Sequence, residues 1–410
     1  MPLNSRLQQL HDYPFTKLNR LLDGITPNPN LEPISLAIGE PQHAPPAAAL
    51  EALSRSLSEI NRYPTTGGQA ELRSTIGRWI CQRYGIDPTN FDSQALVLPV
   101  QGSREALFAA AQFIVDAEGE ENPAVLLPSP FYQIYEGAAL MAGAEPVYLP
   151  LCKENGFAID FQSLDPELLD RCAMVFLCNP SNPTGVSVSE ADYLQLLALA
   201  EKHNFVIASD ECYSEIYPLE QAPLPGLVQV AFKFAADRGG SDDPLKRVLV
   251  FNSLSKRSNL AGLRSGFVAG GRQLMSSFLK YRTYHGSAMP LHHQAASIAA
   301  WQDESHVVEN REHYRRKLSQ AVARLESVPG LDVRYPEGGF CLWLGVSGCD
   351  QQFAKGLFEA CNVRVLPGSF LAREVAGFNA GHGFVRLAMV HEEALCNEAV
   401  DRLVDFTGSR

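Results

Sequence analysis

Short apolar runs alternate with helical segments over much of the chain, and this alternation constrains the fold more than any other feature. Between about residues 46 and 299, helical patterns cover Leu50–Ile60, Ala70–Tyr84 and Arg104–Ala117. Seven apolar runs lie between and after them, most ending in Gly, Pro, Asn, Asp or Ser: 95–100, 124–127, 146–149, 174–178, 205–209, 248–251 and 266–268. Strands of this length alternating with helices predict an α/β fold with a mostly parallel seven-stranded sheet flanked by helices.

The pattern changes after about Trp301. A long charged helix is predicted over Glu304–Leu325 and a C-terminal helix over Glu392–Phe406. Between these two helices lie four short apolar runs: 331–335, 340–344, 363–366 and 384–388. Short strands mixed with helices in this way indicate a smaller α+β unit.

The length of the chain, 410 residues, suits two or three packed units rather than one core. The change of pattern near residue 300 places the boundary between them. We therefore expect a large α/β domain at residues 46–300 and a small α+β domain formed by residues 1–45 and 301–410. The first residues would form an N-terminal arm of the small domain.

Acidic residues outnumber basic ones, 46 against 34, which gives a net charge of −12. This balance disfavours nucleic acid or an anionic membrane as a partner, because both require a basic face. No stretch approaches the ~20 apolar residues of a membrane span, and no secretory signal is evident. The nine cysteines include no C-x-x-C pair, so we expect reduced thiols rather than disulfides or metal ligands, with a catalytic cysteine as the alternative. These features predict a cytoplasmic protein.

Three polar signatures precede residue 140. Because ligands bind beyond the carboxyl ends of strands in such sheets, residues that follow the apolar runs are candidates. Ser103 and Arg104 open a helix after one run, where free N–H groups suit a phosphate; the alternative is a helix capped by Ser103. Tyr132 follows another run, as a core aromatic or as a stacking face for a flat heteroaromatic ring. Tyr63 precedes a Pro/Gly turn, which it could simply anchor.

Three further candidate residues follow the runs at 174–178 and 205–209. Asn182 lies in the turn Asn179–Gly185, where two Asn-Pro dipeptides force an extended backbone. The same turn projects an amide that can hydrogen-bond a phenolic oxygen. Asp210 and Tyr213 come directly after the run at 205–209. A carboxylate in that position either caps a helix or keeps the ring nitrogen of a pyridine protonated.

The last signature contains Ser253, Lys256 and Arg264, after the run at 248–251. Lysines are mostly solvated surface charges, but this one lies among hydroxyl residues beside an apolar strand. A lysine that loses its proton easily forms an imine with an aldehyde, and a neighbouring cation favours its neutral form. Together the six signatures supply a phosphate cradle, a carboxylate, donors to a phenolic oxygen and an aromatic lid for an aldehyde cofactor.

These motifs resemble those of the fold-type I class I/II aminotransferases, over essentially the whole chain. The resemblance rests on N-P-T-G from Asn182, D-x-x-Y from Asp210, and S-x-x-K ending at Lys256 with the arginine that follows. It implies pyridoxal 5'-phosphate (PLP) as the cofactor, bound covalently by Lys256, which also acts as general acid and base. Asp210 would pair with the pyridinium nitrogen, while Asn182 and Tyr213 would donate to the phenolic oxygen.

The resemblance also assigns the remaining candidates. The ring would stack on Tyr132, and the phosphate would be held by Ser103, Arg104, Ser253 and Arg264. Tyr63 would reach the phosphate of a neighbouring subunit, which implies a homodimer with shared active sites. Arg386, otherwise a surface charge on an edge strand, would grip the α-carboxylate of an amino-acid or oxo-acid substrate, with Gly39 packed near it.

The N-terminal residues resemble a narrower group, the bacterial N-succinyldiaminopimelate aminotransferases. The similarity lies in Tyr13-Pro14-Phe15 and in the run from Ser35 to His43, although Gln42 departs from the lysine expected there. It implies transfer of the amino group of L-glutamate to N-succinyl-2-amino-6-oxopimelate. Both substrates carry a second carboxylate, for which three cations are candidates: Lys17, Arg20 and Arg282.

Other activities remain open at this point. The same motifs suit an aspartate, alanine or aromatic aminotransferase. They also suit a PLP-dependent lyase of the same fold. A non-catalytic PLP-binding regulator is a further alternative, but the acidic chain offers no basic DNA-binding module.

Overall fold

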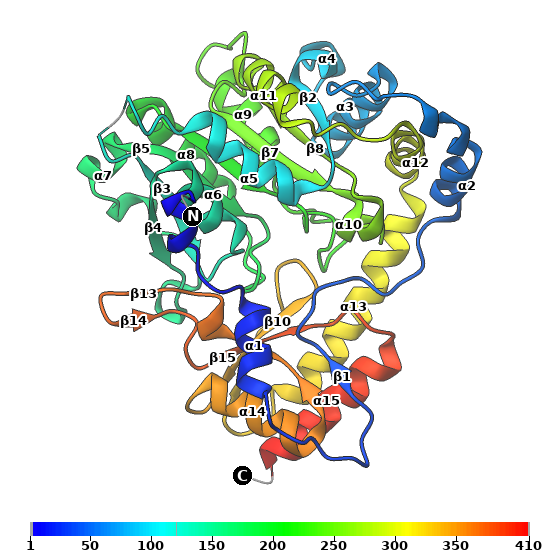
Figure 1. Cartoon of the computed structure of the whole chain (residues 1–410), viewed down its shortest axis with the longest axis vertical. Coiled ribbons are helices and arrows are strands. Elements are labelled where there is room, and N and C mark those ends of the chain that lie inside the picture. Colours follow the sequence, from blue (N-terminus) through cyan, green and yellow to red (C-terminus); the bar gives the residue numbers. More distant parts are fainter. Residues whose placement is uncertain (1–2, 120, 409–410) are drawn as a thin grey trace.

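The computed structural model describes residues 3–119 and 121–408 of the chain. Its largest sheet confirms the expected α/β fold, because each of the seven apolar runs forms one strand (Figure 1). In order across the sheet the strands are β2 (Val97–Val100), β8 (Gly266–Gly270), β7 (Val248–Ser253), β6 (Val206–Asp210), β5 (Cys172–Cys178), β3 (Ala124–Ser129) and β4 (Glu145–Pro150). Strand β8 is antiparallel to both its neighbours, and the other adjacent pairs are parallel.

Helices surround this sheet and continue into the rest of the chain. They are α1 (Pro14–Leu22), α2 (Ala47–Arg55), α3 (Ala70–Tyr84), α4 (Ser93–Leu96), α5 (Ser103–Ile114), α6 (Ile134–Ala142), α7 (Pro166–Asp170), α8 (Glu190–His203), α9 (Leu227–Ala236), α10 (Leu254–Arg257), α11 (Arg272–His285), α12 (Leu291–Gln302), α13 (Ser305–Leu325), α14 (Asp350–Cys361) and α15 (Glu393–Gly408). Within the described residues, no helix is long and apolar enough to cross a membrane.

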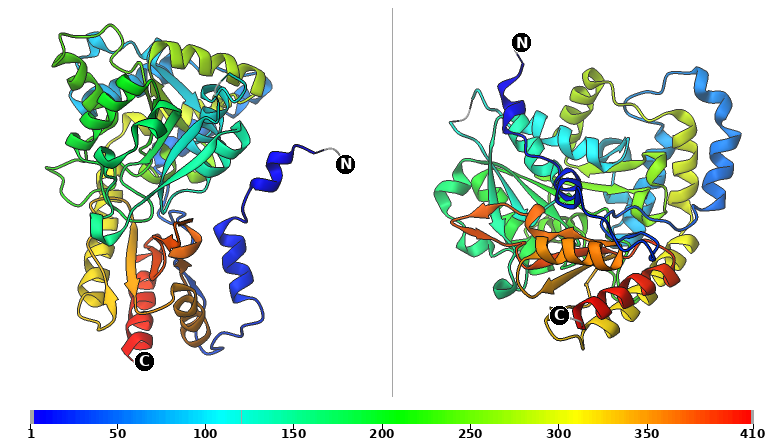
Figure 2. Two further views of the ribbon diagram at one scale, coloured as in Figure 1. Left: turned by 90° about the vertical axis from the view of Figure 1, so that its left-hand side faces the viewer. Right: turned by 60° about the horizontal axis from the view of Figure 1, so that its bottom comes forward.

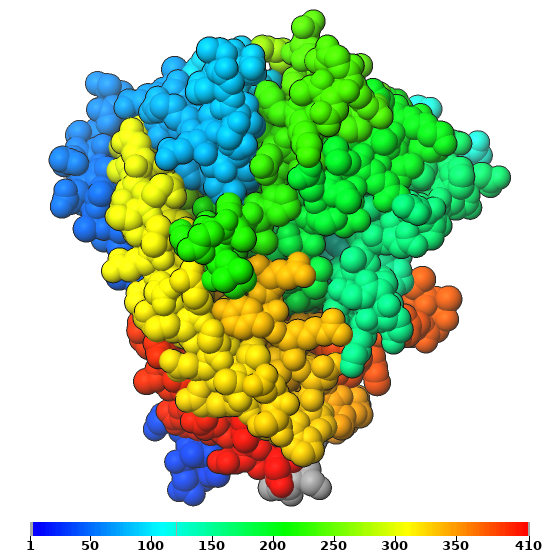
Figure 3. Space-filling view, turned by 180° about the vertical axis from the view of Figure 1, so that it is seen from behind, coloured from blue at the N-terminus to red at the C-terminus, as the bar shows by residue number. Residues whose placement is uncertain are grey.

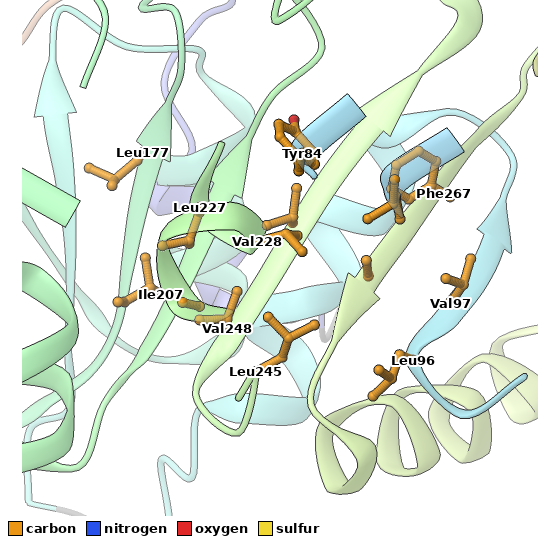
Figure 4. Close-up of a cluster of buried hydrophobic side chains, with 14 of the residues drawn as sticks. Tyr84, Leu96, Val97, Leu177, Ile207, Leu227, Val228, Leu245, Val248 and Phe267 are labelled. Carbon is orange, nitrogen blue, oxygen red and sulfur yellow. The ribbon is translucent and has the colours of Figure 1, made fainter. Parts of the chain in front are cut away.

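Both faces of the large sheet are buried, which explains why its strands are continuously apolar rather than alternating. In β5, Val175 and Leu177 face a cluster that includes side chains of α8 and α9. Figure 4 shows part of this cluster, with Leu227 of α9 close to the strand residues. Met174 and Phe176 point to the opposite face, against α5 and α6. This two-sided core fixes where each strand ends, and so where the polar residues after it emerge.

The C-terminal part contains a second, antiparallel sheet. Its strand order is β12 (Leu366–Pro367), β15 (Phe384–Ala388), β10 (Cys341–Val346) and β9 (Leu331–Asp332). Buried side chains around this sheet come mainly from residues 314–406. Figure 3 shows α13 (yellow) running along the back of the molecule towards α15 (red). The domain boundary near residue 300 stays a prediction.

Three segments differ from the sequence prediction. The helix expected over Leu50–Ile60 ends at Arg55 and continues as a 3-10 helix, Leu57–Asn61. The run at 331–335 forms only the two-residue strand β9. The run at 363–366 is divided, because β11 (Val363–Arg364) pairs with β1 (Ile34–Ser35) while β12 joins the second sheet.

The N-terminal segment lies against parts of the chain that are far away in sequence. Strand β1 is parallel to β11, and the N–H of Leu36 donates to the carbonyl of Arg364 while its carbonyl accepts from the N–H of Ala388. In the left view of Figure 2, α1 lies along one side of the molecule and residues 3–13 extend outwards from it. Residues 36–43 then run from the second sheet towards the end of β7, where Lys256 is located.

Candidate active site

A cavity of about 520 Å³ opens where the carboxyl ends of the large sheet meet the C-terminal sheet. It is lined by residues that follow β2, β3, β5, β6 and β7, together with Arg386 of β15. Ten of the candidate residues line it: Gly39, Ser103, Arg104, Tyr132, Asn182, Asp210, Tyr213, Lys256, Arg264 and Arg386. Residues separated by hundreds of positions therefore converge on one space, as expected for an α/β sheet.

Lys256 lies in α10, the short helix that follows β7. Its Nζ donates to the carbonyl oxygen of Gly39 and lies 5.5 Å from the centre of the Phe340 ring. Burial lowers the pKa of Lys256 to about 8, and the nearby cation of Arg386 acts in the same direction. The amine is therefore much closer to its neutral, nucleophilic form than an exposed lysine.

This pKa predicts how cofactor-free protein captures PLP. Only the neutral amine attacks an aldehyde, so the capture rate should rise about tenfold per pH unit below pH 8. Above pH 8 the rate should level off, whereas an ordinary lysine would show a continuing rise towards its unperturbed pKa. Stopped-flow absorbance after mixing with PLP at pH 6–10 measures this profile. A rate that still climbs tenfold per unit above pH 9 would contradict the assignment.

Asp210 ends β6 and is only 4% exposed. One carboxylate oxygen accepts from the Tyr135 hydroxyl at 2.9 Å, and the other accepts from the backbone N–H of Cys212 at 3.3 Å. Burial raises the pKa of Asp210, and no lysine or arginine of the described residues forms an ion pair with it. A protonated ring nitrogen in the cavity would provide the missing cation.

Tyr135 was not identified from the sequence, although it orients Asp210. Its ring stacks on Phe176 at 4.8 Å, and its side chain is fully buried. Because Tyr135 lies among apolar residues, the sequence alone indicates an ordinary core aromatic. Its position at the start of α6, three residues after Tyr132, is the one signal that could have revealed it.

The start of α5 forms a cradle for an anion. Gly102 precedes the helix with φ +79°, and no side chain caps the free N–H groups. The structure therefore places Gly102, not Ser103, at the cap position. The guanidinium of Arg264 packs directly on Gly102, since an added Cβ would lie 2.3 Å from Nη2. Free N–H groups and one arginine at a helix start suit a phosphate.

Tyr132 and Arg104 lie together at the wall of the cavity. The Nε of Arg104 donates to the Tyr132 hydroxyl at 2.6 Å, and its guanidinium lies 5.8 Å from the ring centre. From the sequence, only the backbone of Arg104 was expected to contribute. The structure instead turns its side chain along the cavity, which adds a cation to the lining.

Arg386 is a buried cation without a counter-ion. The side chain is on β15, and the residue is 6% exposed. Its Nη1 donates to Asn182 Oδ1 at 3.1 Å and its Nη2 to the carbonyl of Ala37 at 2.7 Å, while Nε has no partner. No carboxylate among the described residues lies within 4.0 Å of it. Because a buried unpaired charge is costly, this arrangement favours an anionic ligand such as a carboxylate.

Two candidates do not line the cavity. Tyr63 is 102% exposed in the single chain. Ser253 is buried behind the cavity, where its hydroxyl lies 3.0 Å from the carbonyl of Ser265 and accepts from the N–H of Ser255. Ser255 lines the cavity in its place. Its signal in the sequence is that a second serine directly precedes Lys256.

The three cations considered for a second carboxylate lie elsewhere. Arg282 is fully buried and pairs with Glu105 at 2.7 Å. Arg20 is exposed and pairs with Asp12 at 2.8 Å. Lys17 lies 6.0 Å from the ring centre of Phe370. None of the three lines the cavity, whereas Arg104 does.

One group outside the cavity could share a metal ion. The ligand atoms of Cys349, Asp350 and His382 lie within 4.8 Å of one another. Both carboxylate oxygens of Asp350 already accept backbone N–H groups, from Ser369 and Gly383. These two hydrogen bonds explain the position of the Asp350 carboxylate without a metal ion. That the protein binds no metal ion stays a prediction.

The fold and these residues define the class of protein. A cradle for a phosphate, a buried carboxylate, a lysine with a lowered pKa and an unpaired arginine suit PLP and an amino acid in one cavity. PLP supplies an electron sink for the charge left when a proton leaves the substrate. The protein is a PLP-dependent enzyme of fold type I.

Comparison with known proteins identifies the family. The model of the aminotransferases of class I and II matches residues 32–403, so the chain belongs to this family. An aminotransferase from Neisseria meningitidis has a similar structure, with a TM-score of 0.91 and 42% identity over 99% of this chain and all of that one. The aminotransferase AspB from Helicobacter pylori gives 0.87 and 33%, over 98% and 100%. The LL-diaminopimelate aminotransferase of Dehalococcoides mccartyi is 29% identical, over 99% of each chain.

Proposed function

We propose that the protein transfers the amino group of L-glutamate to N-succinyl-2-amino-6-oxopimelate, giving N-succinyl-LL-2,6-diaminopimelate. The observation that carries the proposal is the unpaired, buried Arg386, which would hold the α-carboxylate of either substrate. Arg104 at the cavity wall supplies a second cation for the distal carboxylate that both substrates carry. The resemblance at residues 13–15 and 35–43 supports the choice of acceptor.

In this proposal the candidate residues divide the work of catalysis and cofactor binding. The Nζ of Lys256 would take the proton from Cα of the substrate and return a proton to the carbon on the other side of the transferred nitrogen. Asp210, oriented by Tyr135, keeps the ring nitrogen of the cofactor protonated. Asn182 and Tyr213 hold its phenolic oxygen. The start of α5 and Arg264 hold its phosphate.

A second candidate activity is that of an LL-diaminopimelate aminotransferase. Several relatives with 26–29% identity carry this name, including the one from Dehalococcoides mccartyi. Glu40 also lines the cavity, and its carboxylate would suit the free distal ammonium of LL-diaminopimelate. An N-succinylated substrate lacks that ammonium, so the two candidates differ at one functional group.

A panel of amino donors with 2-oxoglutarate as acceptor separates the candidates. We expect kcat/KM for N-succinyl-LL-2,6-diaminopimelate to exceed the values for aspartate, alanine and phenylalanine by roughly 100-fold or more. A higher value for LL-diaminopimelate would establish the second candidate instead. If aspartate, alanine or phenylalanine exceeded both, the diaminopimelate assignment would be wrong. Release of ammonia without an acceptor would indicate a lyase.

We also propose a cytoplasmic homodimer with shared active sites. In a single chain Tyr63 is fully exposed, and Leu57 and Ile60 close to it are 53% and 73% exposed. Such a patch is typical of a subunit interface. Light scattering should give twice the mass of one chain. Mixing Lys256→Ala and Tyr63→Phe subunits tests the sharing, because one site of each mixed dimer would then receive both native residues.

A further inference from the structure

A buried lysine lies close to the active site without an acidic partner. Lys317, on α13, is 1% exposed, and no carboxylate of the described residues lies within 4.0 Å of it. Its Nζ lies 3.0 Å from Nε2 of His43 and donates to the carbonyl of His391 at 2.8 Å. Burial lowers the pKa of Lys317 to about 8. Because burying an unpaired charge is energetically costly, a buried lysine of this kind is a candidate for a functional role.

The contact with His43 continues to the backbone of Lys256. Nδ1 of His43 lies 2.9 Å from Oδ1 of Asn310, a residue that is 3% exposed. Nδ2 of Asn310 donates to the carbonyl of Lys256 at 3.1 Å and to the carbonyl of Arg257 at 3.3 Å. These contacts form one chain of hydrogen bonds, from Lys317 through His43 and Asn310 to α10.

The chemistry of each group fixes the direction of every hydrogen bond in this chain. Two carbonyl oxygens face one end of the Asn310 amide, so that end must be the NH2 group. The amide oxygen then faces His43, whose Nδ1 must carry the proton. Nε2 of His43 is left with a lone pair and accepts from the Lys317 ammonium. A proton on Nε2 would point at that ammonium, so His43 is neutral, with its hydrogen on Nδ1.

The segment that carries His43 also touches the other end of Lys256. The carbonyl of Gly39 accepts from Nζ, four residues before His43 in the chain. The N–H of Gln42 donates to the carbonyl of Val390 at 3.3 Å, which attaches the segment to the C-terminal sheet. The rings of His313 and Tyr314 on α13 each lie 4.9 Å from the His43 ring. Residues 39–43 thus contact the amine of Lys256 directly and its backbone through Asn310.

We infer that His43 and Asn310 are positioning residues that fix α10 so that Nζ of Lys256 meets the reacting carbon, and that Lys317 fixes the tautomer of His43. The inference rests on the role proposed for Lys256. None of the three lines the cavity, so their effect on the reaction is indirect. An error of about 1 Å in placing a catalytic group can cost up to roughly 100-fold in rate.

Two amide variants of His43 test the inference as a matched pair. In His43→Asn the new amide nitrogen can take the place of Nδ1 and still donate to Asn310. In His43→Gln the amide reaches the place of Nε2 and contacts Lys317, but Asn310 loses its donor. We expect kcat for His43→Gln to fall roughly tenfold with KM for glutamate within about twofold, and kcat for His43→Asn to stay within about threefold of wild type. Equal losses in both variants, or no loss in His43→Gln, would overturn it.

A measurement without cofactor gives an independent answer. Nitrogen-15 NMR of histidine-labelled, cofactor-free protein at pH 7.5 reports which ring nitrogen carries the hydrogen, and the His43 signal is assigned by its loss in His43→Asn. We expect the Nδ1–H form. The Nε2–H form, or a doubly protonated ring, would overturn the inference. Failure of the proposed function has a different signature, since the donor panel would then favour another amine while the tautomer of His43 stayed unchanged.

Discussion

Replacement of Lys256 by alanine is expected to abolish amino transfer. The variant lacks both the amine that bonds the cofactor aldehyde and the base that moves the substrate proton, so kcat should fall by roughly 10⁵-fold or more. The visible absorbance band of lysine-bound PLP should also be absent. The measurement is kcat with glutamate as donor, together with a spectrum of the loaded protein.

Lys202→Ala is the matched control for this prediction. Lys202 is exposed on α8, so its loss should change neither kcat nor the spectrum. If Lys256→Ala retained more than about one per cent of wild-type turnover, another group would have to be the base. A retained visible band would show that another lysine bonds the cofactor.

Removal of the Arg386 guanidinium should have the next largest effect. In Arg386→Met, kcat/KM for glutamate is expected to fall roughly 10²- to 10³-fold, because the α-carboxylate loses two charge-assisted hydrogen bonds in a buried site. The visible band of bound PLP should remain, since Arg386 is placed on the substrate and not on the cofactor. Steady-state kinetics and a spectrum of the same sample measure both.

Arg386→Lys gives the control for charge alone. An ammonium keeps the positive charge but cannot form the two parallel hydrogen bonds of a guanidinium, so its kcat/KM should lie between those of wild type and Arg386→Met. Equal activity of wild type and Arg386→Met would contradict the assignment. Loss of the PLP band in either variant would indicate a structural role instead.

The large sheet could be predicted from the sequence because both of its faces are buried. Seven apolar runs then stand out against polar turns, and each forms a strand. Since each strand ends at the last residue of its apolar run or within two residues of it, residues such as Asp210 could be assigned to the carboxyl edge of the sheet. The short strands of the C-terminal part were less predictable. The run at 363–366 serves two sheets, and its pairing with Ile34 depends on a segment more than 300 residues away.

Side-chain partners across distant segments could not be predicted. The chain from Lys317 to Lys256 passes through His43, which is 267 residues from Asn310. The direction of the Arg104 side chain likewise depends on the Tyr132 hydroxyl, 28 residues away. Local sequence fixes which residue leaves a strand or opens a helix, whereas tertiary packing decides which side chains meet. The sequence therefore indicated ten of the residues that line the cavity but not the residues that orient them.

The central claim is that the protein is a PLP-dependent aminotransferase in which Lys256 bonds the cofactor. One spectroscopic measurement tests this claim most directly. Purified protein is loaded with PLP, and its absorbance spectrum is recorded before and after addition of L-glutamate. The account predicts a visible band that glutamate converts to a band at shorter wavelength, with one 2-oxoglutarate released per active site. A protein that shows no visible band after PLP is added would contradict the cofactor site and the function built on it.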